Sequence, residues 1–135
     1  MFLGKSGAIL LGFPDTTQDA DEFPAKSEQN GQAIVASLRE LGFQLTDADI
    51  AAIVGGKAIV QLKDGPFDLD LIFAPDGIEK FDDAWTRRVE VDGLPVCHPD
   101  DIIASKRAAG RAKDQESLPR LIAVREYWER HLKNR

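Results

Sequence analysis

Two pairs of aspartates with the spacing of a β-strand stand in separate parts of the chain. The first is Asp19 and Asp21 in "DADEF", and the second is Asp68 and Asp70 in "FDLDLIF". Successive side chains of a strand point to opposite faces, so the members of each pair share a face, with Cα atoms roughly 6.6 Å apart. Two such strands side by side would bring three or four carboxylates together.

Carboxylates that are held close together repel one another, and they all stay ionised only when a cation sits among them. Their hard oxygen atoms suit Mg²⁺ or Mn²⁺, which proteins commonly hold with one or two carboxylates and the phosphates of a substrate. Such an ion can bridge the phosphates of a nucleotide and offset the charge that develops during transfer. The same spacing also fits the solvent face of an edge strand, so spacing alone leaves both interpretations open.

Charge is distributed unevenly along the sequence. The 135 residues carry a net charge of −6, yet residues 104–135 hold nine Lys or Arg against four acids, which makes that segment +5. Residues 1–103 therefore carry −11. An acidic body with a basic end could hold a metal in one half and a phosphate with the other. A solvated basic helix face is the alternative.

The overall composition is that of an ordinary globular protein. Hydrophobic residues make up 43% and charged residues 30%, and the length fits one domain over residues 1–135. No apolar run approaches the roughly 20 residues that span a bilayer, and the start does not resemble a secretion signal. The single Cys97 cannot form an internal disulfide. These features predict an intracellular, cytoplasmic protein without a membrane partner.

Local patterns predict an α+β domain, in which a small mixed β-sheet has helices against it. Apolar periodicity, caps and turn residues indicate the elements. We expect strands at 8–11 and 19–23, helices at 27–43 and 46–54, a hairpin at 55–74, a helix at 77–89, a hairpin at 89–97, and helices at 98–110 and 113–132. Residues 97–135 would form a C-terminal helical part, with Pro119 in the first turn of its last helix.

Several single residues are more typical of structural roles than of chemistry. Trp85 and Trp128 fall on helical stripes and are expected in the core, and Cys97 is expected to be buried. His98 precedes Pro99 and fits a helix cap or a surface position, since no second His is near in sequence.

Three segments together resemble a known family. They are "FLGKSGAILLGFPDTTQDADEF" at 2–23, "FDLDLIF" at 67–73 and "DDIIASKRAAGRAKDQESLPRL" at 100–121. The chain resembles, over most of its length, the bacterial nucleotidyltransferase-like proteins, which are small relatives of the polymerase-beta-like fold. That family includes toxins and antitoxins of toxin–antitoxin pairs. The resemblance implies a nucleotidyltransferase-like version of the α+β fold.

The resemblance implies a metal site made of three aspartates. Asp19 and Asp21 match the paired metal ligands of the family. Asp70 matches the third carboxylate, whose catalytic role is to bind the metal and to activate the attacking hydroxyl. Asp68 would then be a bystander. The implied cofactor is Mg²⁺ or Mn²⁺.

The resemblance also changes the interpretation of the N-terminal segment. Residues 6–11 would form a short helix rather than a strand, and Gly4, Lys5 and Ser6 would form the nucleotide-facing turn before it. Turn amides and helix N-termini attract phosphate.

Basic residues near the C-terminus complete the implied nucleotide site. Lys106 matches a position that can face phosphate, and Arg107 and Arg111 could assist it. Asp114 fits the N-terminal cap of the last helix.

Two functions follow from the resemblance, and a third from the residue types. The first is an enzyme that moves a nucleoside monophosphate from a nucleoside triphosphate to a hydroxyl of RNA, protein or a small molecule. The second is a catalytically inactive binding module or antitoxin-type partner of another chain. It is favoured by Lys5 where the family has Gly or Ser, by Asp15 where it has Arg, and by the few residues before Gly4. The third is a metal-dependent nuclease.

Overall fold

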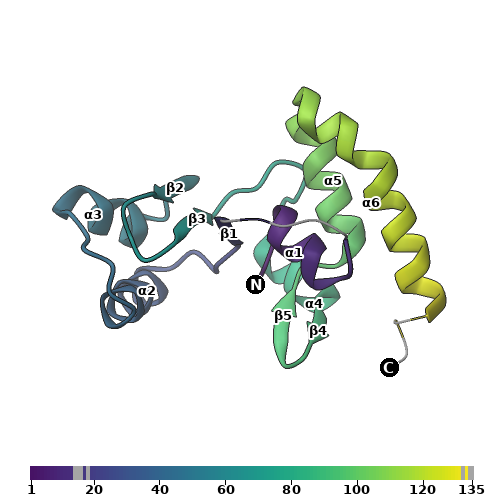
Figure 1. The fold of residues 1–135 in the computed structure, drawn as a ribbon. Coiled ribbons are helices and arrows are strands. Elements are labelled where there is room, and N and C mark those ends of the chain that lie inside the picture. Colours follow the sequence, from purple (N-terminus) through teal and green to yellow (C-terminus); the bar gives the residue numbers. More distant parts are fainter. Residues whose placement is uncertain (14–16, 18, 132, 134–135) are drawn as a thin grey trace.

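The computed structural model describes residues 1–13, 17, 19–131 and 133. Figure 1 shows its elements: α1 (Gly4–Leu10), β1 (Asp19–Glu22), α2 (Glu28–Glu40), α3 (Asp47–Gly55), β2 (Ile59–Leu62), β3 (Asp68–Ile72), α4 (Phe81–Arg87), β4 (Val89–Val91), β5 (Leu94–Val96), α5 (Pro99–Ala109) and α6 (Ala112–His131). This mixture of helices and small sheets confirms the α+β class. A nucleotidyltransferase-like form of that class stays a prediction.

The main sheet is small and mixed, as expected. Its strand order is β1–β3–β2, with β1 parallel to β3 and β2 antiparallel to it. The hairpin of β2 and β3 follows the alternation in the sequence, because Leu69 and Leu71 are buried on one face while Asp68 and Asp70 stand on the other. The parallel partner β1 comes from a distant part of the chain.

Residues 1–3 connect this sheet to the β4–β5 hairpin through backbone hydrogen bonds. On the hairpin side, the Phe2 amide donates to the Pro95 carbonyl at 2.9 Å, and the Cys97 amide donates to the Phe2 carbonyl at 2.9 Å. On the β1 side, the Leu3 amide donates to the Asp21 carbonyl at 3.0 Å. Helix α1, which follows directly, is thereby held next to β1.

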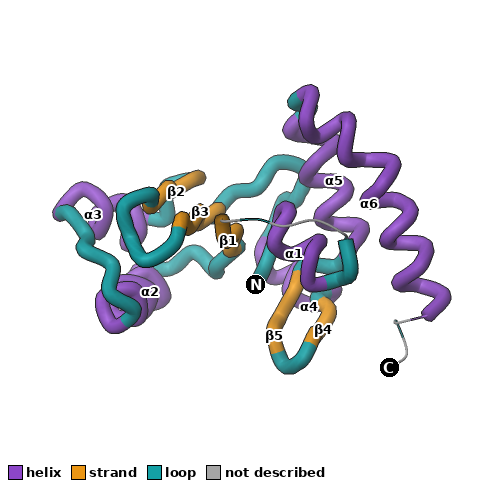
Figure 2. Tube along the Cα trace, viewed as in Figure 1, coloured by secondary structure: helices purple, strands orange, loops and turns teal. Residues whose placement is uncertain are grey.

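The buried apolar side chains form two clusters. One lies among α1, α4, α5, α6 and the hairpin, and the other lies among α2, α3 and the β2–β3 pair (Figure 2). Phe23 is fully buried in the first cluster and Ile53 in the second. Strand β1 runs between the two groups of elements. A single domain over 1–135, with 97–135 as its helical part, stays a prediction.

The predicted helix ends agree with the structure at most of the caps. The Ser27 side chain caps α2, and Thr46 and Asp49 form a capping box at α3. His98 caps α5, since its Nδ1 accepts the Asp100 amide at 3.0 Å. Cys97 beside it is fully buried, as expected.

Two helices differ from the expectations drawn from local patterns. Residues 8–11 are not a strand, because α1 occupies Gly4–Leu10. Helix α6 begins at Ala112, so Pro119 lies inside it and not in its first turn. The start is set by contacts of Asp114 with Arg111 and with α5, which the local pattern does not contain. No helix in the described residues is long and apolar enough to cross a membrane.

Two expected core residues are at the surface. Trp128 is buried, but 37% of Trp85 is exposed; its ring stacks on Phe81, and the Arg88 guanidinium lies 3.9 Å from the ring centroid. Leu41, which follows Ile34 and Leu38 at the i, i+4, i+7 spacing that predicts a buried helical stripe, is 58% exposed. Leu41 lies beyond the end of α2 at Glu40, whereas Trp85 lies within α4 on a face that the rest of the described chain leaves partly uncovered.

The crossing of α2 and α3 generates a test of the second cluster. A Cβ at Gly31 would lie 2.7 Å from the Val54 Cα atom, which is backbone and cannot move aside cheaply. We expect Gly31→Ala to lower the free energy of unfolding by about 2 kcal/mol, because it forces the two helices apart.

The matched control is Gly55→Ala, since a Cβ at that position would meet nothing within 4 Å. It should be neutral or should stabilise by up to about 1 kcal/mol through lower entropy of the unfolded chain. Urea unfolding followed by circular dichroism measures both. Equal stability of the two variants would show that the helices are not in close contact at Gly31.

Candidate active site

The register of β1 and β3 brings the two aspartate pairs onto one face of the sheet. Asp19 lies beside Asp68 and Asp21 beside Asp70. In a parallel pair, residues in register point to the same side, so the four carboxylates share one face. The two pairs identified in the sequence thus lie next to each other.

A cavity of about 400 Å³ opens over this face. Its walls come from α1, β1, β2, β3, α5 and α6. Among the predicted site residues, those that line the cavity are Gly4, Lys5, Asp19, Asp21, Asp70, Lys106 and Arg111. Ser6 and Asp68 are not part of the lining, and Arg107 lines a different hollow together with Arg125.

The cavity has an acidic side and a basic side. The strands contribute Asp19, Asp21 and Asp70, and the α5–α6 region contributes Lys106 and Lys113 with Arg111. The acidic and basic parts of the sequence therefore face each other across the cavity. A ligand that carries both a cation and phosphates would meet complementary charge on both sides.

The carboxylate of Asp21 is half-buried and lies against Gly4 at the start of α1. Burial has the largest effect and raises the pKa of Asp21, and the negative charges of Asp70 and Asp19 raise it further. The positive charge of Lys106 and a hydrogen bond with the backbone of Ser6 lower it, but by less. The net result is a raised pKa, so a cation placed here would favour the ionised form.

The Gly-Lys-Ser segment forms the first turn of α1 rather than a turn before it. Gly4 has φ of +59°, and a Cβ there would lie 2.8 Å from Oδ2 of Asp21, so glycine is required both for the backbone and for the space. The Ser6 hydroxyl is buried, donates to the Leu3 carbonyl at 3.0 Å and accepts the Asp21 amide at 3.0 Å. Ser6 therefore joins α1 to β1. Lys5 is exposed at the cavity.

Asp70 has an unusual environment for a carboxylate. Its Oδ1 atom is buried and has no hydrogen-bond partner among the described residues. The ammonium of Lys63 lies 3.4 Å from this atom, at the end of β2. Partial desolvation opposes the charge of Lys63, but the negative charges of Asp70, Asp19 and Asp68 outweigh it and raise the pKa of the lysine.

Sequence reasoning missed Lys63. The signal that would have found it is the hairpin register: Gln61 pairs with Asp70, so the residue two positions later is on the carboxylate face, next to Asp68. An alternating strand pattern does contain this information once the turn is fixed.

The oxygen donors on this face fit Mg²⁺ or Mn²⁺ in chemical type, and the buried Oδ1 of Asp70 lacks a partner that a cation would supply. However, within residues 1–13, 17, 19–131 and 133 no group of three or more His, Cys, Asp or Glu side chains is arranged to hold a metal ion. The side chains would have to reorient to share one ion. The metal site of Asp19, Asp21 and Asp70 therefore stays a prediction. Asp15 lies outside the described residues.

Asp114 is not the N-terminal cap of α6, contrary to expectation. It lies inside the first turn of the helix with its side chain 1% exposed. Its carboxylate accepts from Nε of Arg111 at 2.6 Å and pairs with Nζ of Lys106 at 3.4 Å. Burial alone would raise its pKa, but the hydrogen bond from Arg111 and the charge of Lys106 bring it below the usual range. Asp114 thus positions the basic side of the cavity.

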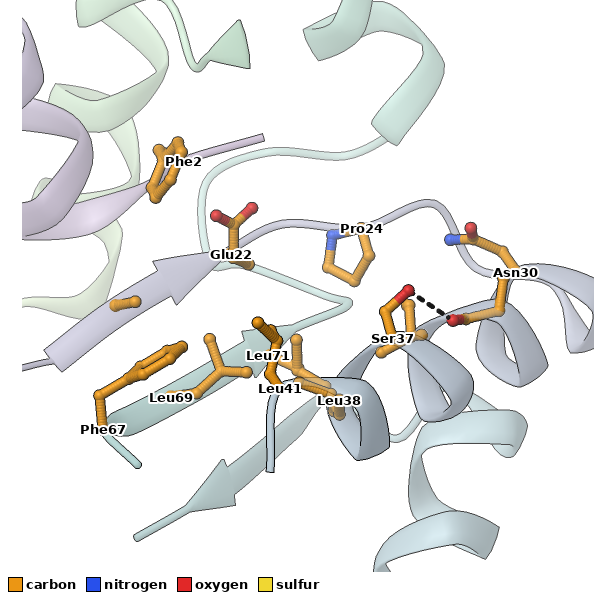
Figure 3. Close-up of a pocket in the computed structure, with 13 residues that line it drawn as sticks. Phe2, Glu22, Pro24, Asn30, Ser37, Leu38, Leu41, Phe67, Leu69 and Leu71 are labelled. Atoms are coloured by element: carbon orange, nitrogen blue, oxygen red, sulfur yellow. Dashed lines mark hydrogen bonds between the residues drawn. The ribbon is translucent and has the colours of Figure 1, made fainter. Parts of the chain in front are cut away.

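A second hollow, of about 430 Å³, lies on the opposite face of the sheet (Figure 3). It is mostly apolar, with Leu69 and Leu71 from β3 facing Leu38 of α2. Its polar groups are already used within the chain, since the Asn30 amide donates to the Ala25 carbonyl and the Ser37 hydroxyl donates to the Ala33 carbonyl. This hollow offers little for chemistry, so the carboxylate face is the better candidate.

Comparison of the chain with protein-family models, with curated proteins and with solved structures finds no match.

Removal of the Asp114 charge tests how the basic side is held. We expect Asp114→Asn to lower the free energy of unfolding by about 2–3 kcal/mol at neutral pH, because Lys106 loses its counter-charge in a largely buried position. The exposed Glu116 on the same helix provides the control, and Glu116→Gln should change stability by less than about 0.5 kcal/mol. Urea unfolding measures both.

The stability difference between wild type and Asp114→Asn should also depend on pH. The lowered pKa of Asp114 means that its stabilisation is present above the ordinary value of 3.8 and is lost as the pH falls through the lower folded value. The stability gap between wild type and Asp114→Asn should therefore narrow below about pH 4. A gap that is the same at pH 7 and in acid would contradict the ion pairs.

Proposed function

We propose that this protein is a nucleotidyltransferase, which moves a nucleoside monophosphate from a nucleoside triphosphate to a hydroxyl acceptor and releases pyrophosphate. The observation that supports it best is the single cavity with Asp19, Asp21 and Asp70 on one side and Lys106, with other basic residues, on the opposite side. A triphosphate with its divalent cation carries the charges that such a cavity complements. The volume of about 400 Å³ lies in the range of small-molecule sites.

In this proposal, Asp19, Asp21 and Asp70 would hold Mg²⁺ or Mn²⁺. The ion supplies charge neutralisation and orientation of the phosphates. Asp70 accepts the proton of the acceptor hydroxyl, and its buried Oδ1 is an acceptor without a hydrogen bond in the described residues. Lys106, which Asp114 holds in place, would bind the phosphates.

A second candidate function is a catalytically inactive module of the same type that binds a partner chain, as in a toxin–antitoxin pair. Two observations favour it: Lys63 already lies against Asp70, and no three-carboxylate metal centre is formed in the described residues. A cation that comes from the protein itself reduces the need for a metal. Transfer of labelled nucleotide distinguishes the two functions directly.

Substitution of the carboxylates tests the enzymatic proposal. Asp21→Asn and Asp70→Asn should each lower Mg²⁺-dependent transfer from an α-labelled nucleoside triphosphate by at least about a hundredfold, because each removes a ligand or the proton acceptor. Asp68→Asn is the matched control on the same strand and should retain most of the activity, since its side chain does not line the cavity. Circular dichroism checks that each variant is folded. Transfer that survives both substitutions would rule out the proposed mechanism.

Ligand-induced stabilisation separates the enzyme from the partner module without knowledge of the acceptor. With Mg²⁺ and a bound nucleoside triphosphate the midpoint of thermal unfolding should rise, and the rise should grow with ligand concentration. No rise with any of the four nucleotides favours the partner module. Cleavage of labelled RNA or DNA, instead of nucleotide addition, would indicate a nuclease.

A further inference from the structure

Lys63 is a cation of the chain itself that lies beside Asp70 on the carboxylate face, outside the lining of the cavity. It follows β2 directly, and its Nζ lies 3.4 Å from Oδ1 of Asp70. The charges of Asp19 and Asp68 also act on it, so three carboxylates share its field. A positive charge here reduces the repulsion that parallel pairing of the two aspartate strands creates.

The contact between Lys63 and Asp70 is loose. A distance of 3.4 Å exceeds the 2.7–3.2 Å of ordinary hydrogen bonds, and Oδ1 of Asp70 has no hydrogen-bond partner in the part of the chain that the structure describes. The lysine side chain is 45% exposed, whereas that of Asp70 is 18% exposed. A flexible, strongly hydrated ammonium can therefore leave for water while the carboxylate stays in place.

We propose that Lys63 is the resident counter-cation of the carboxylate face and is displaced from Asp70 when a divalent ion binds. This inference rests on the proposed function, because it assumes that Asp70 is a metal ligand. A divalent ion carries twice the charge of the ammonium and takes its place at the same oxygen. Lys63 thus weakens binding of the metal alone and partly offsets the negative charge of the face while the site is empty.

Titration of the nucleotide-free protein with Mn²⁺, followed by electron paramagnetic resonance of the free ion, tests this role. Lys63→Gln should bind Mn²⁺ about three- to tenfold more tightly than wild type, because a competing charge has been removed. Lys63→Arg, which keeps the charge, should stay near the wild-type affinity. Lys57→Gln removes the same charge before the start of β2, at the end of the strand away from Lys63, and should have little effect.

The same titration in proteins that carry Asp70→Asn shows whether Lys63 changes the Mn²⁺ affinity through that carboxylate. There, Lys63→Gln should change Mn²⁺ affinity by less than about twofold, since the oxygen for which the two cations compete is no longer charged. A full effect of Lys63→Gln without Asp70 would overturn the direct competition.

Thermal unfolding of the metal-free protein provides a second measurement of the role of Lys63. Lys63→Gln should lower the midpoint of thermal unfolding of the metal-free protein relative to Lys57→Gln, because the carboxylates lose their counter-charge, and Mn²⁺ should remove the difference. If wild type binds Mn²⁺ and Lys63→Gln binds it equally, the role of Lys63 is wrong while the metal site stands. If no variant binds Mn²⁺ at millimolar concentrations, the metal site is wrong and the inference is overturned with it.

Discussion

The candidate site depends on the parallel pairing of β1 with β3 in one register. That register sets Asp21 beside Asp70, and a slip by one residue would turn the carboxylates of β1 to the apolar face. The backbone of Asp21 is fixed on its other edge as well, since its carbonyl accepts from Leu3 and its amide donates to Ser6. Residues 1–3 and the buried hydroxyl of Ser6 therefore hold the strand in position, and the acidic side of the cavity follows from that.

This pairing brings like charges together, and the surrounding groups show how the chain tolerates it. Lys63 lies against Asp70 from β2, and Lys106 acts on Asp21 from α5. Lys106 in turn is held by the buried Asp114. Positive charge is thus present on both sides of the carboxylates. Lys63 makes a partly exposed contact with Asp70, whereas Lys106 lies beside the buried Asp114. Both ammonium groups lie 3.4 Å from their carboxylate, but the side chain of Lys63 is 45% exposed and that of Lys106 is 19% exposed.

Much of the local structure could be predicted from the sequence, because the signals are short. The shared face of Asp68 and Asp70, the turn that follows β2 and the cap at Thr46 each depend on neighbours a few residues apart. The α+β class followed from the sum of such signals. Composition also indicated an acidic and a basic part, which the cavity brings face to face.

The features that could not be predicted arise from contacts between distant segments. The sequence alone did not indicate that β1 would lie parallel to β3, which sets Asp21 beside Asp70. Pro119 lies inside α6, whose first turn is tied to α5 by the ion pair of the buried Asp114 with Lys106. The periodicity predicts Trp85 in the core, yet it lies on a face of α4 that the rest of the described chain leaves partly uncovered.

The hydrogen bonds of Phe2 to Pro95 and Cys97 have a consequence for biosynthesis. A ribosome releases the chain from its N-terminal end, so the earliest residues have no hairpin to join until nearly a hundred more have been translated. The cluster formed by α2, α3 and the β2–β3 hairpin contains only nearby segments and can condense much sooner. The bonds of Phe2 to Pro95 and Cys97 therefore close the longest loop of the fold, and we expect them to form after that cluster has condensed.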